Sequence, residues 1–110
     1  MSRLQVPPLP DLPSAAAAAF HLDVMPEAVA LLADGASEMT LLFAPADHTH
    51  NGWRLSAVQT LAREHAPARV NAIAGADEAA IAAALAYLES ADGVTGQYLP
   101  LDDAGAGAVV

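Results

Sequence analysis

Residues Leu61–Gly75, with the sequence LAREHAPARVNAIAG, decide the fold class of this chain. Pro67 cannot continue a helix, because it lacks a backbone N–H and its ring clashes with the preceding turn. The apolar run RVNAIA at 69–74 is short and bounded by turn residues, which is typical of a buried strand. Gly75 then turns the chain into a helix expected over 77–91. Helix, strand and helix follow one another with short connections, as in an α/β fold.

The same alternation continues on both sides of this stretch. MTLLFA at 39–44 is another compact apolar run that predicts a buried strand. A helix over 52–66, capped by Asn51, is expected to connect it to the strand at 69–74. A third strand is expected at 96–101. Strands joined by single helices predict a parallel sheet with right-handed crossovers.

The N-terminal third of the chain is expected to form two helical pieces, at 15–22 and 26–34. Ser14 is a candidate N-cap of the first piece. Pro26 suits the first turn of a helix better than its interior, so we place a break before it. Gly35 follows the second piece at the position where a left-handed residue commonly ends a helix.

The two ends of the chain differ in composition from its centre. PPLPDLP at 7–13 is stiff and extended, since each proline fixes φ and restrains its predecessor. Residues 3–6 before it are either a short strand or a disordered tail. We therefore divide the chain into a proline-rich segment at 1–14, a single domain at 15–104 and a flexible tail at 105–110.

The charge balance is strongly acidic. Thirteen acidic residues against four basic ones give a net charge of −9. Binding to nucleic acid requires Lys or Arg gathered on one face, so nucleic acid and anionic membrane surfaces are poor partners. No window approaches roughly 18 uninterrupted apolar residues, and the N-terminal prolines interrupt any signal-peptide core. With no cysteine in the chain, we expect a cytoplasmic protein without a membrane partner.

The helix expected at 77–91 is nearly apolar all round. Ile81 and Leu85 have core spacing, while the opposite face carries alanines such as Ala79 and Ala83. A surface helix of a monomer normally has a polar face. Two interpretations stay open: alanine is simply a strong helix former, or the second face is covered by another subunit.

Three segments together resemble the C-terminal half of a short-chain dehydrogenase/reductase. Leu61–Gly75 resembles that family's "L-A-x-E-x-A-P … R-V-N-x-I-x-P-G", and Ala79–Asp103 resembles its last helix followed by "T-G-Q-x-L-x-V-D-G-G". AVALLADGASEMTLLFAP, at 28–45, is similar to the helix that leads into the family's fifth strand. The resemblance covers roughly 20–104 and implies an α/β fold, a truncated Rossmann-like three-layer structure with a small parallel sheet.

The chemistry of that family has no counterpart in these residues. Its cofactor-binding half, with a Gly-rich turn, is not matched. Its Tyr-x-x-x-Lys pair falls on about Asp47 and Asn51, its helix Asn falls near His21, and 44–46 replace the loop with the catalytic Ser. Asp47 is a carboxylate at neutral pH and Asn51 carries no charge. The resemblance therefore implies no catalytic residue, no cofactor-binding residue and no cofactor.

The loop DHTH leaves a second chemistry open. His48 and His50 on an extended segment would point the same way, and Asp47 could add an oxygen ligand. A zinc site needs three or four ligands, so His21 or His65 would have to converge on this loop. The other interpretations are a solvated polar loop and a contact with a small molecule. We assign no metal-binding residue.

Two strand edges need partners. The strand at 39–44 would have an open apolar edge where the family's sheet continues, and such an edge promotes aggregation. We expect 3–6 to pair there. Pro100 lacks an N–H, which places the strand at 96–101 at the other edge.

Three further side chains carry expectations. Trp53 is either a core residue or an interface anchor, and we favour the interface, because Trp is over-represented among binding hot spots. Tyr98 is expected to pack with its hydroxyl exposed. His65, near the end of the helix at 52–66, is expected to interact favourably with the helix dipole.

We expect a non-catalytic short-chain-dehydrogenase-like protein that dimerises. The resemblance implies a homodimer through the helices at 15–34, 52–66 and 77–91. It also implies a structural or regulatory partnership with a full-length NAD(P)-dependent reductase. The alternative is a small oxidoreductase-like, metal-binding or ligand-binding protein that uses the DHTH loop.

Overall fold

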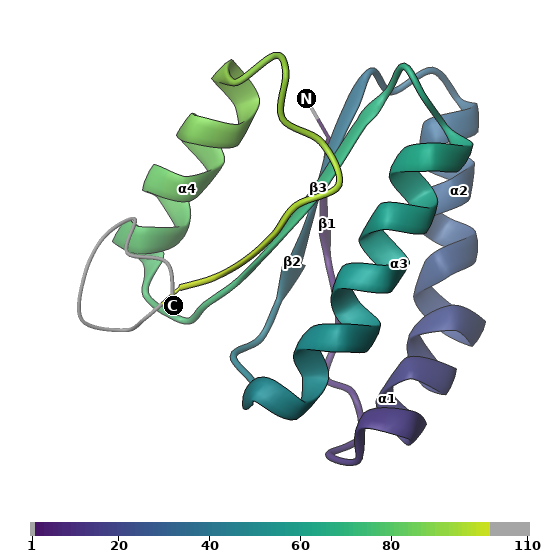
Figure 1. The fold of residues 1–110 in the computed structure, drawn as a ribbon, viewed down its shortest axis with the longest axis vertical. Coiled ribbons are helices and arrows are strands. Elements are labelled where there is room, and N and C mark those ends of the chain that lie inside the picture. The colour runs from purple at the N-terminus through teal and green to yellow at the C-terminus, as the bar shows by residue number, and fades with distance from the viewer. Residues whose placement is uncertain (1, 102–110) are drawn as a thin grey trace.

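The computed structural model describes residues 2–101. They form a four-stranded parallel sheet with helices on both faces (Figure 1). In chain order the elements are β1 (Ser2–Gln5), α1 (Pro13–Ala19), the π-helical turn η1 (Phe20–Val24), α2 (Met25–Ala33), β2 (Glu38–Phe43), the 3-10 turn η2 (His48–His50), α3 (Asn51–Glu64), β3 (Arg69–Ala74), α4 (Glu78–Ser90) and β4 (Tyr98–Pro100). The expected truncated Rossmann-like α/β fold is confirmed. The predicted tail at 105–110 lies outside the described residues, and the domain limits stay predictions.

Each strand of the sheet pairs with its neighbour in the sequence, in the order β1-β2-β3-β4. β1 runs parallel to β2 with Leu4 opposite Leu41, which confirms that an N-terminal strand covers the edge of β2. β4 lies at the other edge, as the missing N–H of Pro100 predicted. It is shorter than the expected 96–101, because Gly96, at φ +73°, still belongs to the turn.

Pro13–Ala33 is one continuous helical run rather than two separate pieces. Pro26 lies in the first turn of α2, as predicted, but no break precedes it. Instead the helix widens into η1, where the N–H of Met25 donates to the carbonyl of Phe20, five residues back. The wider turn lets the helix reach the proline, which has no N–H to offer, without changing direction.

Two expected N-caps are wrong. Ser14 lies inside α1, because Pro13, whose fixed φ suits the first helical position, starts the helix after Leu12. Asn51 is the first residue of α3 rather than its cap, because η2 leads directly into that helix. Asp47 caps η2 instead.

Three other helix ends agree with the predictions made from the sequence. Asp77 caps α4, and its carboxylate accepts a hydrogen bond of 2.8 Å from the N–H of Ala80. Gly35 follows α2 at φ +103°, a left-handed conformation that favours glycine. His65 is the C-cap of α3, the end of the helix where its imidazole was expected.

The core has two parts, one on each face of the sheet. The α3 face, covered by α1, α2 and α3, contains the aromatic residues: Phe20 and Phe43 stack at 5.6 Å between ring centroids, and Trp53 packs on Phe20 at 5.4 Å. The α4 face is smaller and contains aliphatic side chains such as Ile73 and Leu88. Trp53 therefore packs against the core, the interpretation that the sequence analysis did not favour.

The third crossover has the opposite hand to the first two. The helices between β1 and β2 and between β2 and β3 lie on the α3 face, whereas α4 lies on the other face (Figure 1). Each of the three connections leads to the next strand on the same side, in the order β1-β2-β3-β4, so a helix on the opposite face gives the opposite hand. The expectation of right-handed crossovers throughout is therefore wrong. Burial of Ile73 and Leu42 under α4 accounts for the difference, because the second face of the sheet would otherwise be exposed.

Pro13–Ala33 is also long and apolar enough, by length and composition alone, to cross a membrane. It carries Asp23 and Glu27, and its buried side chains recur at every fourth position and pack on the sheet, as at Phe20 and Ala28. The run is thus one layer of the α/β domain. The absence of a membrane partner stays a prediction.

Candidate functional site

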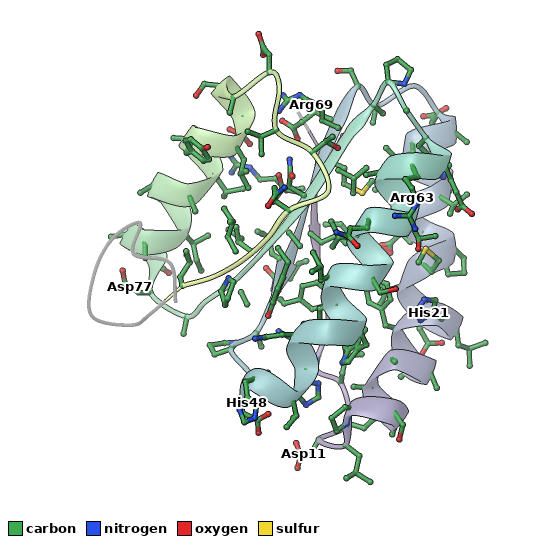
Figure 2. All side chains as sticks on the ribbon, viewed as in Figure 1. Asp11, His21, His48, Arg63, Arg69 and Asp77 are labelled. Atoms are coloured by element: carbon green, nitrogen blue, oxygen red, sulfur yellow. The ribbon has the colours of Figure 1, made fainter. Side chains whose placement is uncertain are left out.

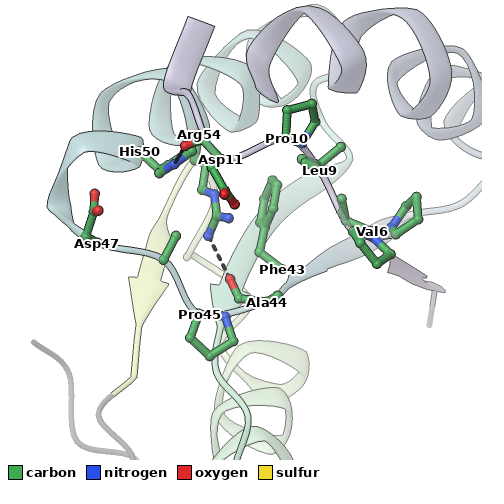
Figure 3. A pocket seen from close by; sticks show the side chains of 13 residues that line it. Val6, Leu9, Pro10, Asp11, Phe43, Ala44, Pro45, Asp47, His50 and Arg54 are labelled. Atoms are coloured by element: carbon green, nitrogen blue, oxygen red, sulfur yellow. Dashed lines mark hydrogen bonds between the residues drawn. The ribbon is translucent and has the colours of Figure 1, made fainter. Parts of the chain in front are cut away.

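The carboxyl ends of β1 and β2 border a cavity of about 320 Å³. Parallel sheets commonly bind ligands at this end, because loops from several strands converge there. Two segments line the cavity, the proline-rich connection Val6–Asp11 and the loop Phe43–Asp47, together with His50 and Arg54 (Figure 3). The DHTH loop and the start of α3 thus lie at this site.

Asp47 is held as an anion. Its carboxylate accepts hydrogen bonds from the hydroxyl and from the backbone N–H of Thr49, the latter at 2.9 Å. These bonds, the hydroxyl first, lower the pKa of Asp47 below its ordinary value of 3.8. The side chain therefore orders η2 and has no proton to donate at neutral pH.

His50 is buried, and both of its ring nitrogens are in use. The indole N–H of Trp53 donates to Nδ1 at 3.0 Å, and since indole is only a donor, Nδ1 must be unprotonated. Nε2 therefore carries the proton and donates to the backbone carbonyl of Asp11 at 2.9 Å. This bond ties the proline-rich segment to α3 and leaves His50 no lone pair for a metal ion.

The other histidines do not join the loop in a metal site. His48 is exposed on η2, and His21 uses Nδ1 in a contact of 2.8 Å with the carbonyl of Ala17 on its own helix (Figure 2). Within residues 2–101, no three His, Cys, Asp or Glu side chains are grouped so that they could hold a metal ion. The geometry of residues 2–101 therefore gives no support to the alternative that the DHTH loop binds a metal ion.

Arg54 is the functional candidate that the sequence analysis missed. Its side chain is only 5% exposed, and Nη1 donates to the carbonyl of Ala44 and to the hydroxyl of Tyr98, both at 3.0 Å. The guanidinium also stacks over the ring of Phe43 at 4.4 Å. Tyr98 was expected to pack with its hydroxyl exposed; the residue is half-buried, and its hydroxyl accepts this bond from Arg54.

A sequence pattern could have identified Arg54. It lies three and four residues before Ala57 and Val58 and seven before Leu61, which is the buried stripe of α3. A cation on the apolar stripe of a helix is unusual, because lysine and arginine are almost never buried unless paired. Such a position marks either a buried network or a site.

The resemblance puts the family's Tyr and Lys at about Asp47 and Asn51, which lie near the start of α3. Asp47 and Asn51 are both exposed and lie on either side of η2. Ala44 and Pro45 directly follow β2 and contribute no hydroxyl to the cavity. The cavity is lined by the buried cation of Arg54, the carboxylates of Asp11 and Asp47 and the imidazole of His50, a set suited to binding rather than to proton donation.

A family model described as "Short chain dehydrogenase-like protein" matches residues 4–101. The matched region includes all the helices and all or part of every strand that the structure describes. The chain therefore belongs to the short chain dehydrogenase-like family, and the resemblance found in its sequence is confirmed. Comparisons with curated proteins and with solved structures found no significant match.

Proposed function

We propose that this chain is a non-catalytic member of the short chain dehydrogenase-like family. The observation that carries the proposal is the start of α3, where Asp47 and Asn51 stand at the places of the family's Tyr and Lys. An ionised carboxylate cannot protonate a carbonyl oxygen, and a neutral amide cannot lower the pKa of a neighbouring acid. The framework supports assembly, and the site does not support hydride transfer.

The same proposal includes a homodimer, and the exposed apolar residues indicate its surface. Among residues 2–101, five large apolar side chains are exposed on or beside the helices of the α3 face: Leu12, Leu22, Val29, Leu31 and Leu55. α4 exposes one, Tyr87. Because α4 covers the opposite face of the sheet, a single two-fold contact cannot include all three predicted helices. We choose the helices of the α3 face.

The exposed charges of this surface among residues 2–101 are mostly acidic and include Asp23 and Glu64, so a second copy finds a complementary charge only at Arg63. α2 carries the exposed Glu27 and is followed by the exposed Asp34, whereas α3 carries the exposed Arg63 (Figure 2). In a two-fold contact, α3 of each copy faces α2 of the other, so that opposite charges approach twice. Within one copy, the described residues place no ion pair on Arg63.

The experiment is the native mass of the purified chain, measured by light scattering after size exclusion. The double substitution Leu22→Glu and Val29→Glu is expected to convert a dimer to a monomer, because both side chains are exposed on the proposed surface. Tyr87→Glu, on α4, is the matched control and is expected to stay dimeric. A monomeric wild type, or dissociation by Tyr87→Glu alone, would contradict the proposal.

A full-length reductase of the same family is the second partner that we propose, through the same helices. The tagged chain would be captured gently from its own cells, beside the variant with Leu22→Glu and Val29→Glu. A full-length reductase at fixed stoichiometry with the wild type, and lost with the variant, is the expected result. Recovery of the homodimer alone would remove the heteromeric part of the proposal.

A further inference from the structure

Arg54 is a buried cation that has no carboxylate partner among residues 2–101. Among residues 2–101, the one ion pair between side chains joins Arg3 to Glu89, far from this site in the sequence. Nη1 of Arg54 donates to two neutral oxygens, and Nε is buried with no hydrogen-bond partner in the same residues. A buried charge that is compensated only by neutral groups is energetically unfavourable, and an anion would relieve it.

Arg54 is one of the residues that line the cavity. Arg54 lies at its base, beside the carbonyl of Ala44, as Figure 3 shows. The volume of about 320 Å³ is at the lower end of the range for small-molecule sites. The bond between His50 and the carbonyl of Asp11 holds the proline-rich wall in place, so that the cavity is formed before any ligand arrives.

The walls of the cavity restrict the class of anion. Val6, Leu9 and Phe43 provide apolar surface in the cavity, and Phe43 also lies under the guanidinium. Asp11 and Asp47 line the same cavity, and their carboxylates repel negative charge on a ligand, about twice as strongly for a dianion as for a monoanion. A guanidinium matches the planar geometry of a carboxylate group. Dianions such as phosphate are therefore disfavoured relative to a single carboxylate.

We propose that this cavity binds a small monocarboxylate with an apolar body, its carboxylate on Arg54 and its body against Phe43 and Leu9. This assignment goes beyond the proposed role in assembly and does not depend on it.

The test uses the fluorescence of Trp53, the single tryptophan of the chain, whose ring is 5.8 Å from the guanidinium carbon of Arg54. The intact protein is titrated with acetate, 3-methylbutanoate and benzoate. 3-Methylbutanamide, which has the same shape and no charge, is the matched ligand control, and inorganic phosphate is the dianion. We expect saturable binding of 3-methylbutanoate or benzoate, and at least about tenfold weaker binding of the amide and of phosphate.

Arg54→Met and Arg54→Lys separate charge from packing. Arg54→Met is expected to weaken carboxylate binding at least about tenfold, whereas Arg54→Lys keeps the charge and part of the affinity. Circular dichroism confirms that each variant is folded, and Arg54→Lys serves alone if Arg54→Met is not. The proposal is overturned if none of the three acids binds saturably, if phosphate binds more tightly, or if a folded variant binds as the wild type does.

Discussion

The two faces of the sheet accommodate their buried side chains in different ways. The α3 face is packed with aromatic rings around Phe20 and Phe43, and its buried cation lies at the edge that borders the cavity. The α4 face has small aliphatic side chains and buries Glu38, Thr40 and Asn71 in its part of the sheet. The α3 face is stabilised mainly by buried apolar area. The stability of the α4 face depends more on whether its buried polar atoms are hydrogen-bonded.

This difference indicates which substitutions affect the cavity and which do not. Substitutions on the α3 face change packing and the site together, because Phe43 belongs to both the core and the cavity. Substitutions on the α4 face change the pairing of polar groups and leave the cavity intact.

The largest expected effect is on the α3 face. Phe20→Ala removes a fully buried ring that contacts Phe43 and Trp53, and it should destabilise the protein by about 3–5 kcal/mol. Urea unfolding measures the loss. Leu88→Ala on the α4 face is the matched control: it should cost about 2–5 kcal/mol but leave the fluorescence of Trp53 in the native state unchanged. If Phe20→Ala and Leu88→Ala changed the native fluorescence of Trp53 equally, the two faces would not differ in the way described.

A smaller effect is expected from the polar groups of the α4 face. The side chain of Asn71 donates to the carbonyl of Val94 and accepts from the N–H of Gln97, both at 3.0 Å, and so anchors the approach to β4. Asn71→Leu leaves both backbone groups without this partner and should cost about 2–4 kcal/mol in urea unfolding.

Thr40→Val is the matched control for Asn71→Leu on the same face. The hydroxyl of Thr40 is fully buried and has no hydrogen-bond partner within residues 2–101. Its replacement by a methyl group of the same shape should change stability by less than about 1 kcal/mol or raise it. A loss as large as that of Asn71→Leu would show that the hydroxyl has a partner and would contradict the contrast.

The smallest effect is at Asp47, on the exposed loop. Its lowered pKa means that the folded state favours the ionised form, so the carboxylate contributes stability above pH 3.8, and this contribution is lost as the pH falls through the folded-state pKa. Asp47→Asn should therefore be slightly less stable than the wild type at pH 7, and the difference should shrink below pH 3.8. Thermal unfolding at pH 7 and pH 3 measures it, and a difference that grows in acid would contradict the assignment.

The strands could be predicted from the sequence because their signals are local. The run at 69–74 matches β3, and 39–44 differs from β2 by one residue at each end. Gly35 and Asp77 were correct for the same reason, since a left-handed residue and an N-cap need only their neighbours. The π-helical turn before Pro26 was not predicted, because it depends on how the helix lies on the sheet.

The site could be predicted only in part. The DHTH loop was placed correctly before the helix, but His48 to His50 form a 3-10 turn instead of an extended segment, so that His48 is exposed and His50 is buried. The role of His50 depends on Trp53, three residues on, and on Asp11, 39 residues away. Arg54 was missed because its acceptors come from the end of β2 and from β4, 10 and 44 residues away. The spacing and composition of a sequence do not show which distant residues will be in contact.

The most direct test of the central claim, that this chain keeps a reductase framework without its chemistry, is a titration of the purified protein with NADPH in the presence of a carbonyl substrate. We expect no saturable binding of NADPH and no oxidation above the buffer rate, since our proposal puts Asp47 and Asn51 at about the places of the family's Tyr and Lys. Oxidation of NADPH that follows the protein concentration, and that Asp47→Asn abolishes, would contradict the account.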